Sequence, residues 1–218
     1  MVDTLGDFAE ALNRMLHELG LPAIAPRHIE NMVGKGSEHL LRSVLAHVLA
    51  EAPSPLPTAA PAQPPHSVEG LYPAAWDSYQ KHYLAINGQY AVVYAGVVDG
   101  LQALRAAGLR LVCLTNKPTS FAVPLLQAKG LHGYFEHVYG GDAFERKKPD
   151  PLPLLKACEA LGTQPARTLM VGDSSNDAQA ARAAGCPVVL VTYGYNHGQP
   201  VRAVDADGFV DSLQQLHR

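Results

Sequence analysis

The sequence predicts an α/β protein with a Rossmann-like parallel sheet core and a separate helical region inserted into it. From residue 91 to residue 218, short apolar runs alternate with amphipathic stretches, as in the β-α units that build a parallel sheet. Residues 6–90, in contrast, carry apolar side chains at helical spacing and no strand pattern. We therefore assign residues 1–5 and 91–218 to the core and residues 6–90 to the inserted helical domain.

The core elements are placed by apolar runs and by the residues expected at helix ends. Predicted strands cover residues 110–114, 135–139, 168–171, 188–191 and 208–210. Predicted helices cover residues 97–107, 120–129, 152–161, 175–184 and 212–217. A glycine follows four of these helices, as is common at a helix C-terminus: Gly108, Gly130, Gly162 and Gly185.

The inserted region is predicted to be a small helical bundle. A first apolar stripe covers residues 8–19 and a second covers residues 40–49. A third helix is expected over residues 74–87. Residues 52–66, between the second and third helices, are rich in Pro and Ala, and we expect them to form an extended linker loop.

Composition narrows the classes of partner. The formal net charge is −3 at pH 7, which argues against a nucleic-acid partner or a basic membrane-binding surface. No apolar run approaches the roughly 18 residues of a membrane span and no signal peptide opens the chain, so we expect a cytoplasmic protein. The cysteines at 113, 158 and 186 lie mainly in apolar contexts, which favours buried, reduced thiols.

The run from Val171 to Gly185 carries the most specific chemistry. The predicted strand ends at Gly172, Asp173 follows at its carboxyl end, and Asp177 lies in the first turn of the next helix. Open α/β sheets bind ligands at this edge. Carboxylates on a short turn suit Mg²⁺, which takes one or two carboxylates together with phosphate oxygens and water. A role at the helix N-terminus would explain Asp177 but not Asp173.

Two other segments place polar groups near strand ends. Thr115 and Asn116 follow the strand at 110–114, where a Thr hydroxyl and the next backbone N–H can both hydrogen-bond a phosphoryl oxygen. Lys148 precedes Pro149, and a second proline follows at 151, so the restricted backbone can hold this lysine rigidly and aim it inward. Taken singly, either segment is also compatible with an ordinary turn.

In combination, Thr115, Lys148 and Asp173 resemble the motifs of the haloacid dehalogenase superfamily of phosphohydrolases. The resemblance implies an aspartyl-phosphate mechanism with Mg²⁺ as cofactor, Asp173 as metal ligand and Asp177 supporting the waters around the metal. It implies that Thr115 and Asn116 hold phosphoryl oxygens. Lys148 would bind the phosphate too and act as the catalytic lysine that offsets negative charge.

The motif that supplies the nucleophile in this superfamily is not found in the printed sequence. Family members carry D-x-D-G-T at the end of the central strand, leading into a stretch such as Leu-Val-Asp-Thr. Residues 1–4, Met-Val-Asp-Thr, match only the stretch after that motif, and Asp205 and Asp207 have the spacing but precede the last short strand. We therefore expect the strands at 110–114 and 168–171 to lie apart for want of the central strand, and turnover to be lost or very low.

The inserted helices resemble the cap that closes over the active site in phosphatases of this superfamily. Gly34 and Lys35 lie in a glycine-rich turn similar to the one that phosphoglycolate phosphatases place over the substrate, so both are candidate substrate contacts. Lys35 would suit a small carboxylate. The resemblance therefore implies Mg²⁺-dependent hydrolysis of a small phosphorylated metabolite, foremost 2-phosphoglycolate, to glycolate and phosphate.

Two alternatives stay open at this stage. A phosphatase or mutase acting on a phosphosugar would need the cap turn to contact hydroxyl groups instead of a carboxylate. A catalytically silent protein that binds a phosphorylated metabolite would agree with the unmatched nucleophile motif. The oligomeric state is not predicted by the sequence.

Overall fold

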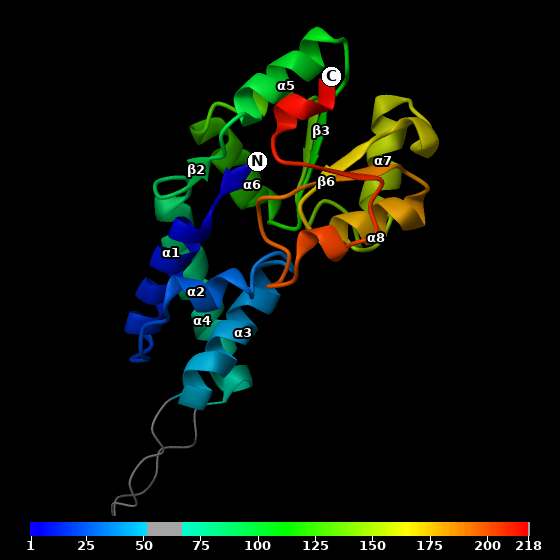
Figure 1. Cartoon of the computed structure of the whole chain (residues 1–218). Helices are drawn as coiled ribbons and strands as arrows, with labels where there is room; N and C mark the ends of the chain where they lie inside the picture. Colours follow the sequence, from blue (N-terminus) through cyan, green and yellow to red (C-terminus); the bar gives the residue numbers. More distant parts are fainter. Residues whose placement is uncertain (52–66, 218) are drawn as a thin grey trace, which may run out of the picture.

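The chain folds into a helical lobe and a sheet lobe, which the computed structural model describes for residues 1–51 and 67–217. The helical lobe consists of α1–α4, drawn in blue to teal in Figure 1, and the sheet lobe follows in green to red. The N-terminus lies between the two lobes, and the short helix Leu213–His217 at the end of the described chain packs against α5. The predicted linker loop, residues 52–66, lies outside the described residues.

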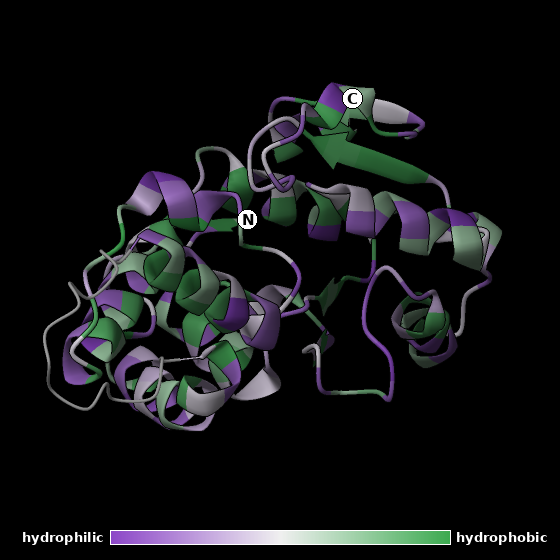
Figure 2. Cartoon of the chain, turned by 90° about the horizontal axis from the view of Figure 1, so that it is seen from below, coloured by the Kyte–Doolittle hydropathy of each residue, from purple (hydrophilic) through white to green (hydrophobic). Residues whose placement is uncertain are grey.

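The helical lobe has its own apolar core. Its helices are α1 (Leu5–Glu18), α2 (Pro26–Glu30), α3 (Ser37–Glu51) and α4 (Val68–Ile86). Apolar and polar residues alternate around these helices (Figure 2). The apolar faces meet in one cluster that includes fully buried Leu12, Met15, Leu41, Tyr79 and Tyr83. Burial of such faces, at about 25 cal/mol for each Å² of apolar surface, is what holds short helices together.

Helix α4 begins earlier than the sequence predicts. We expected it at residue 74, after Pro73, but it begins at Val68 with Ser67 as its N-cap. The Ser67 hydroxyl accepts a hydrogen bond from Gly70 N at 3.1 Å, which satisfies one of the free N–H groups of the first turn. Pro73 therefore lies inside the helix and removes one backbone hydrogen bond. The capped turn before it allows the helix to tolerate this loss.

The sheet lobe confirms the predicted α/β class and the predicted order of elements. Its parallel strands are β3 (Val112–Leu114), β4 (His137–Tyr139), β5 (Met170–Gly172), β6 (Val188–Val191) and β7 (Gly208–Val210). Its helices are α5 (Val97–Ala106), α6 (Thr119–Ala128), α7 (Leu152–Leu161) and α8 (Ser175–Ala184). Short 3-10 helices cover His132–Tyr134, Pro165–Arg167, Val201–Ala203 and Leu213–His217. The last of these replaces the α-helix predicted at 212–217.

Three strands begin two residues later than predicted. The ladder of β3 and β4 begins with Val112 opposite His137, and that of β5 and β6 begins with Met170 opposite Val188. The two residues before each of these strands lie ahead of the paired register, although Glu136 N still donates to Leu111 O at 2.9 Å. A two-stranded antiparallel ribbon, β1 (Val2–Asp3) with β2 (Val92–Val93), connects the lobes and pairs segments about 90 residues apart in the chain.

The parallel strands form two sheets rather than one. β3 pairs with β4, and β5 pairs with β6 and then β7, but no pairing joins β3 to β5 in the part of the chain that the structure describes. A cavity of about 270 Å³ is lined by Cys113 and Leu114 of β3 and by Met170 and Val171 of β5. This is the arrangement expected of a sheet whose central strand is not among the described residues.

Structural partners account for several other features of the sequence. The D-x-D pair at 205–207 is held by Arg182, whose guanidinium donates to Asp205 and Asp207, and Asp207 also accepts from Val188 N at 2.7 Å. The three cysteines are buried and form no disulfide within the described residues. In residues 1–51 and 67–217 we find no helix with the length and apolar character needed to cross a membrane.

Candidate active site

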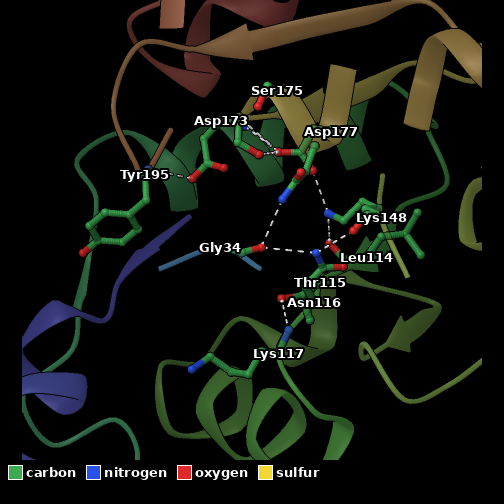
Figure 3. Close-up of polar contacts among 12 residues, drawn as sticks. Gly34, Leu114, Thr115, Asn116, Lys117, Lys148, Asp173, Ser175, Asp177 and Tyr195 are labelled. Carbon is green, nitrogen blue, oxygen red and sulfur yellow. Dashed lines mark hydrogen bonds and ion pairs between the residues drawn. The ribbon is translucent and has the colours of Figure 1, made fainter. Parts of the chain in front are cut away.

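The first wall of the site is the loop that follows β3. Thr115 N donates to Tyr139 O at 3.0 Å, which extends the β3–β4 ladder by one residue, and Thr115 Oγ1 accepts from Lys117 N at 3.1 Å. The Asn116 side chain joins two other loops, because its Nδ2 donates to Lys148 O at 2.8 Å and to Gly34 O at 3.2 Å (Figure 3). The loop is thus fixed with its Thr hydroxyl beside the site.

The second wall is the acidic loop between β5 and α8. Ser174 is the N-cap of α8, and Asp177 completes a capping box with it. Asp177 Oδ2 accepts from the backbone N–H groups of Asp173 and Ser174 at 3.1 Å each, and from Ser174 Oγ at 2.9 Å. A side chain at Gly172 would collide with Asp177, so only glycine allows this close approach of strand and helix.

A buried ion pair joins the two walls. Lys148 Nζ donates to Asp177 Oδ1 at 2.7 Å and to Leu114 O at 3.0 Å, and both charged side chains are less than a tenth exposed. Burial by itself would lower the pKa of Lys148, but the Asp177 carboxylate outweighs it and raises the pKa. Burial likewise opposes ionisation of Asp177, yet Lys148 and the hydrogen bonds to the carboxylate lower its pKa. Both groups are therefore charged at neutral pH.

Asp173 lies beside this pair and is held loosely by comparison. Its Oδ2 accepts from Tyr195 N at 3.4 Å. Gly194 leaves room for this carboxylate, because any side chain at position 194 would collide with it. Burial, together with the nearby Asp177 carboxylate, raises the pKa of Asp173 to about 6. The α-amino group of Met1 is buried near Asp173, and this burial lowers its pKa. A carboxylate with spare lone pairs next to other charged groups is a candidate for a cation or a phosphate-bound metal.

The donor set can be tested against Mg²⁺. Asp177 uses both oxygens on Lys148, Ser174 and backbone N–H groups, whereas the Asp173 carboxylate accepts a single long hydrogen bond. No cluster of three or more His, Cys, Asp or Glu side chains suited to a metal occurs in the described ranges. Mg²⁺ commonly takes only one or two carboxylates and completes its shell with water and phosphate oxygens, so one free aspartate fits this ion and would not suit zinc.

The turn that carries Gly34 is fastened to the sheet lobe. Gly34 O accepts from Asn116 and also from Asn176 Nδ2 at 3.3 Å, while the His197 ring binds Val33 O at 3.0 Å and Asn176 at 3.3 Å. His197 has φ +53°, a conformation uncommon for residues other than glycine. The sequence does not single out Asn176 and His197. Their hydrogen-bond partners at residues 33 and 34 lie far away in the chain, and no neighbouring residue indicates the positive φ of His197.

Most of the predicted site residues line one cavity. It is the cavity that also separates β3 from β5, and its wall includes Gly34, Thr115, Asn116, Lys148, Asp173 and Asp177. The Lys35 side chain is exposed and is not part of this wall, so its role as a substrate contact stays a prediction. Two wall residues that the sequence did not single out are Phe8 of α1 and Lys117.

Comparison with known proteins gives consistent matches over nearly the whole chain. The family described as "Haloacid dehalogenase-like hydrolase" matches residues 1–191. A phosphoglycolate phosphatase from Thiobacillus denitrificans is 44% identical over 215 residues, which cover 99% of this chain and 88% of that protein. A phosphoglycolate phosphatase from Nitrosospira multiformis is 43% identical over 215 residues, with the same coverage of 99% and 88%.

A solved structure agrees with these sequence matches. The crystal structure of a protein from Haemophilus somnus 129PT, described as a predicted phosphoglycolate phosphatase, is similar to this chain with a TM-score of 0.89 and 30% identity. The similarity covers 99% of this chain and 91% of that one. The sheet lobe and the helical lobe therefore both have counterparts in one known fold.

Proposed function

Because the chain belongs to the haloacid dehalogenase-like hydrolase family, we propose that its site is built for a small phosphate monoester, with 2-phosphoglycolate as the foremost substrate and glycolate and phosphate as products. The observation that carries the proposal is the convergence of Thr115, Lys148 and Asp173 on one cavity. The relatives named as phosphoglycolate phosphatases support the choice of substrate.

Each wall residue has a role that its contacts support. The Thr115 hydroxyl accepts from Lys117 N, so its own hydrogen is free to bind a phosphoryl oxygen. The neighbouring Asn116 N–H has no partner among the described residues and would bind a second oxygen. Lys148, held on Asp177, would offset the negative charge of the phosphoryl group.

Asp173 is the residue that would hold Mg²⁺, and Asp177 would support it indirectly. When bound, the ion would polarise a phosphoryl oxygen and neutralise part of its charge. The position of Asp177 supports this division, since its carboxylate is already saturated and fixes both Lys148 and the backbone of Asp173. Asp173 keeps oxygen lone pairs for the cation.

We further assign a cap function to the helical lobe. The Gly34 turn borders the phosphoryl-binding wall, and its carbonyl is held by Asn116 of the loop after β3 and by Asn176 in the first turn of α8. A lobe placed in this way would exclude water and restrict the size of the ester. We propose residues 6–90 as this cap domain, with the remainder of the chain as the core.

The acidic side chains in the described wall of the cavity are Asp173 and Asp177, which we assign to the metal and to Lys148, so neither is available as the nucleophile. We therefore expect a polypeptide of the printed 218 residues to bind a phosphate monoester without turning it over, with or without Mg²⁺. Assays with 2-phosphoglycolate and p-nitrophenyl phosphate measure this directly. Appreciable Mg²⁺-dependent turnover would mean that another carboxylate attacks phosphorus.

Binding of phosphate tests the site itself. Titration calorimetry of inorganic phosphate in Mg²⁺-containing buffer should give a measurable affinity for the parent chain and at least a 10-fold weaker one for Lys148→Met, the loss expected when a charged hydrogen bond is removed. Lys147→Met is the matched control, because it removes the same charge from the adjacent, exposed residue. Equal binding by both variants would contradict the assignment of Lys148.

A further inference from the structure

The cavity has two cationic side chains among its described lining residues, and they are in different states. Lys148 is neutralised by Asp177 at 2.7 Å. Lys117 forms no ion pair within 4 Å in the described part of the chain. Its ammonium instead donates to the Tyr83 hydroxyl at 2.5 Å and lies over the rings of Phe8 and Tyr83, 4.3 and 4.4 Å from their centroids.

Asp7, whose charge acts on Lys117, does not form an ion pair with it. Asp7 of α1 is fully buried, and its two oxygens accept from Gly88 N and Tyr90 N at 2.7 Å each. Both oxygens thus serve to hold the segment after α4 against α1. Burial lowers the pKa of Lys117 to about 7, and the charge of Asp7 acts in the opposite direction without offsetting it. A buried ammonium without a counter-ion is costly, so an anionic ligand that pairs with it would be stabilised.

The position of Lys117 relates it to the phosphoryl-binding wall. It stands two residues after Thr115 in the same loop, and its N–H binds the Thr115 hydroxyl. Its side chain runs away from Lys148 and Asp173, toward the helical lobe (Figure 3). A ligand whose phosphoryl group lies at Thr115 and Lys148 would therefore extend its other end toward Lys117.

We propose that Lys117 binds the second anionic group of the substrate, the carboxylate of 2-phosphoglycolate, and so selects phosphate esters that carry a carboxylate over those that do not. This rests on the proposed phosphatase site and assigns its specificity. Tyr83 and Phe8 hold the ammonium in place, which limits the side-chain entropy lost on binding. Lys35, exposed and outside the wall, is not needed for this role.

The test compares two ligands of nearly equal size. Ethyl phosphate carries a methyl group where 2-phosphoglycolate carries its carboxylate, so the ratio of their dissociation constants isolates that group. In the parent chain, 2-phosphoglycolate should bind more tightly than ethyl phosphate. In Lys117→Met, the ratio should fall by about 10- to 100-fold, as expected for a lost charged contact, while ethyl phosphate binds as before.

Three variants make the result specific. Lys117→Arg keeps the charge and should retain part of the preference, whereas Tyr83→Phe removes only the hydroxyl contact and should retain most of it. Lys156→Met, which removes an exposed charge on α7, should leave both affinities unchanged. Thermal unfolding of each variant shows that it is folded before binding is compared.

The possible failures are distinguishable. If Lys117→Met weakens both ligands equally, or weakens neither, Lys117 does not recognise the carboxylate and the inference is wrong, although the phosphate site stands. If the parent chain binds neither ligand, or binds them independently of Lys148, the proposed function fails and this inference fails with it.

Discussion

At the scale of single residues, Lys117 carries a cost for folding. Its pKa is near 7 in the folded chain against an ordinary value of 10.5, so between these pH values the unfolded chain holds a proton that the folded chain lacks. The unfolding free energy contributed by this group therefore rises with pH from about 7 upward and is lowest below pH 7. Tyr83 on α4, which faces Lys117, does not reverse this, since burial raises the pKa of Tyr83 well above 10.

Lys117→Met should remove this dependence on pH. We expect its unfolding free energy, from urea titrations at pH 6 to 9, to exceed that of the parent chain at pH 6 and to lose an upward slope of at most about 1.4 kcal/mol for each pH unit. Lys156→Met, which alters net charge equally, should follow the parent curve. Parallel curves for Lys117→Met and the parent would show that the ammonium is well solvated.

The same scale shows why the sequence predicts one part of the site and not the other. Thr115, Lys148 and Asp173 each stand at a position that local pattern marks, after an apolar strand or beside a proline. Asn176 and His197 act through partners 142 and 164 residues away in the chain. Contacts of that range depend on how the lobes meet, which no window of sequence reports.

At the scale of elements, boundaries were predicted best where chemistry fixes them. Helix α8 begins and ends as predicted because Ser174 and Asp177 form a capping box and Gly185 adopts φ +76°. Helix α4 was predicted too short because proline is common at the start of a helix and rare inside one. The packing of residues 68–72 in the helical lobe shows that the turn before Pro73 is helical.

The contact between the Gly34 turn and the sheet lobe gives a prediction at this scale. His197→Asn keeps a residue that tolerates positive φ but removes the ring that binds Val33 and Asn176. Loss of about 1 kcal/mol of contact should raise the open population of the turn about 5-fold. Trypsin should then cut after exposed Lys35 about 5-fold faster, as followed by mass spectrometry, while cuts elsewhere keep their rates.

Asn176→Ala should act in the same direction, because it removes a second contact to the turn. Gln199→Ala, in the same loop as His197 but with an exposed side chain, is the matched control and should behave as the parent chain. Unchanged cleavage after Lys35 in both His197→Asn and Asn176→Ala would mean that other contacts hold the turn.

At the scale of the whole molecule, the fold class was predictable and the division of the sheet followed from it. Alternating strands and helices fix a parallel sheet, and the motif that the printed sequence leaves unmatched belongs to its centre. The structure has β3 and β5 in separate sheets, with Cys113 and Val171 in one apolar cluster that closes part of the space between them. Side-chain packing, which the sequence pattern does not predict, thus joins the two sheets where no backbone pairing of described residues does.

An engineered extension should therefore join the two sheets and confer catalysis, two effects that a single substitution can separate. Placed directly before Met1, an apolar strand ending in D-x-D-G-T can enter the cavity between β3 and β5, whose wall includes Met1 itself. Each new ladder hydrogen bond should add roughly 0.5–1.5 kcal/mol to the unfolding free energy measured in urea. Turnover of 2-phosphoglycolate should appear at the same time, because the first Asp of the motif supplies the attacking carboxylate.

Replacing that Asp with Asn should abolish turnover and keep the stability gain. An extension that leaves stability unchanged would show that the space between the sheets does not accept a strand.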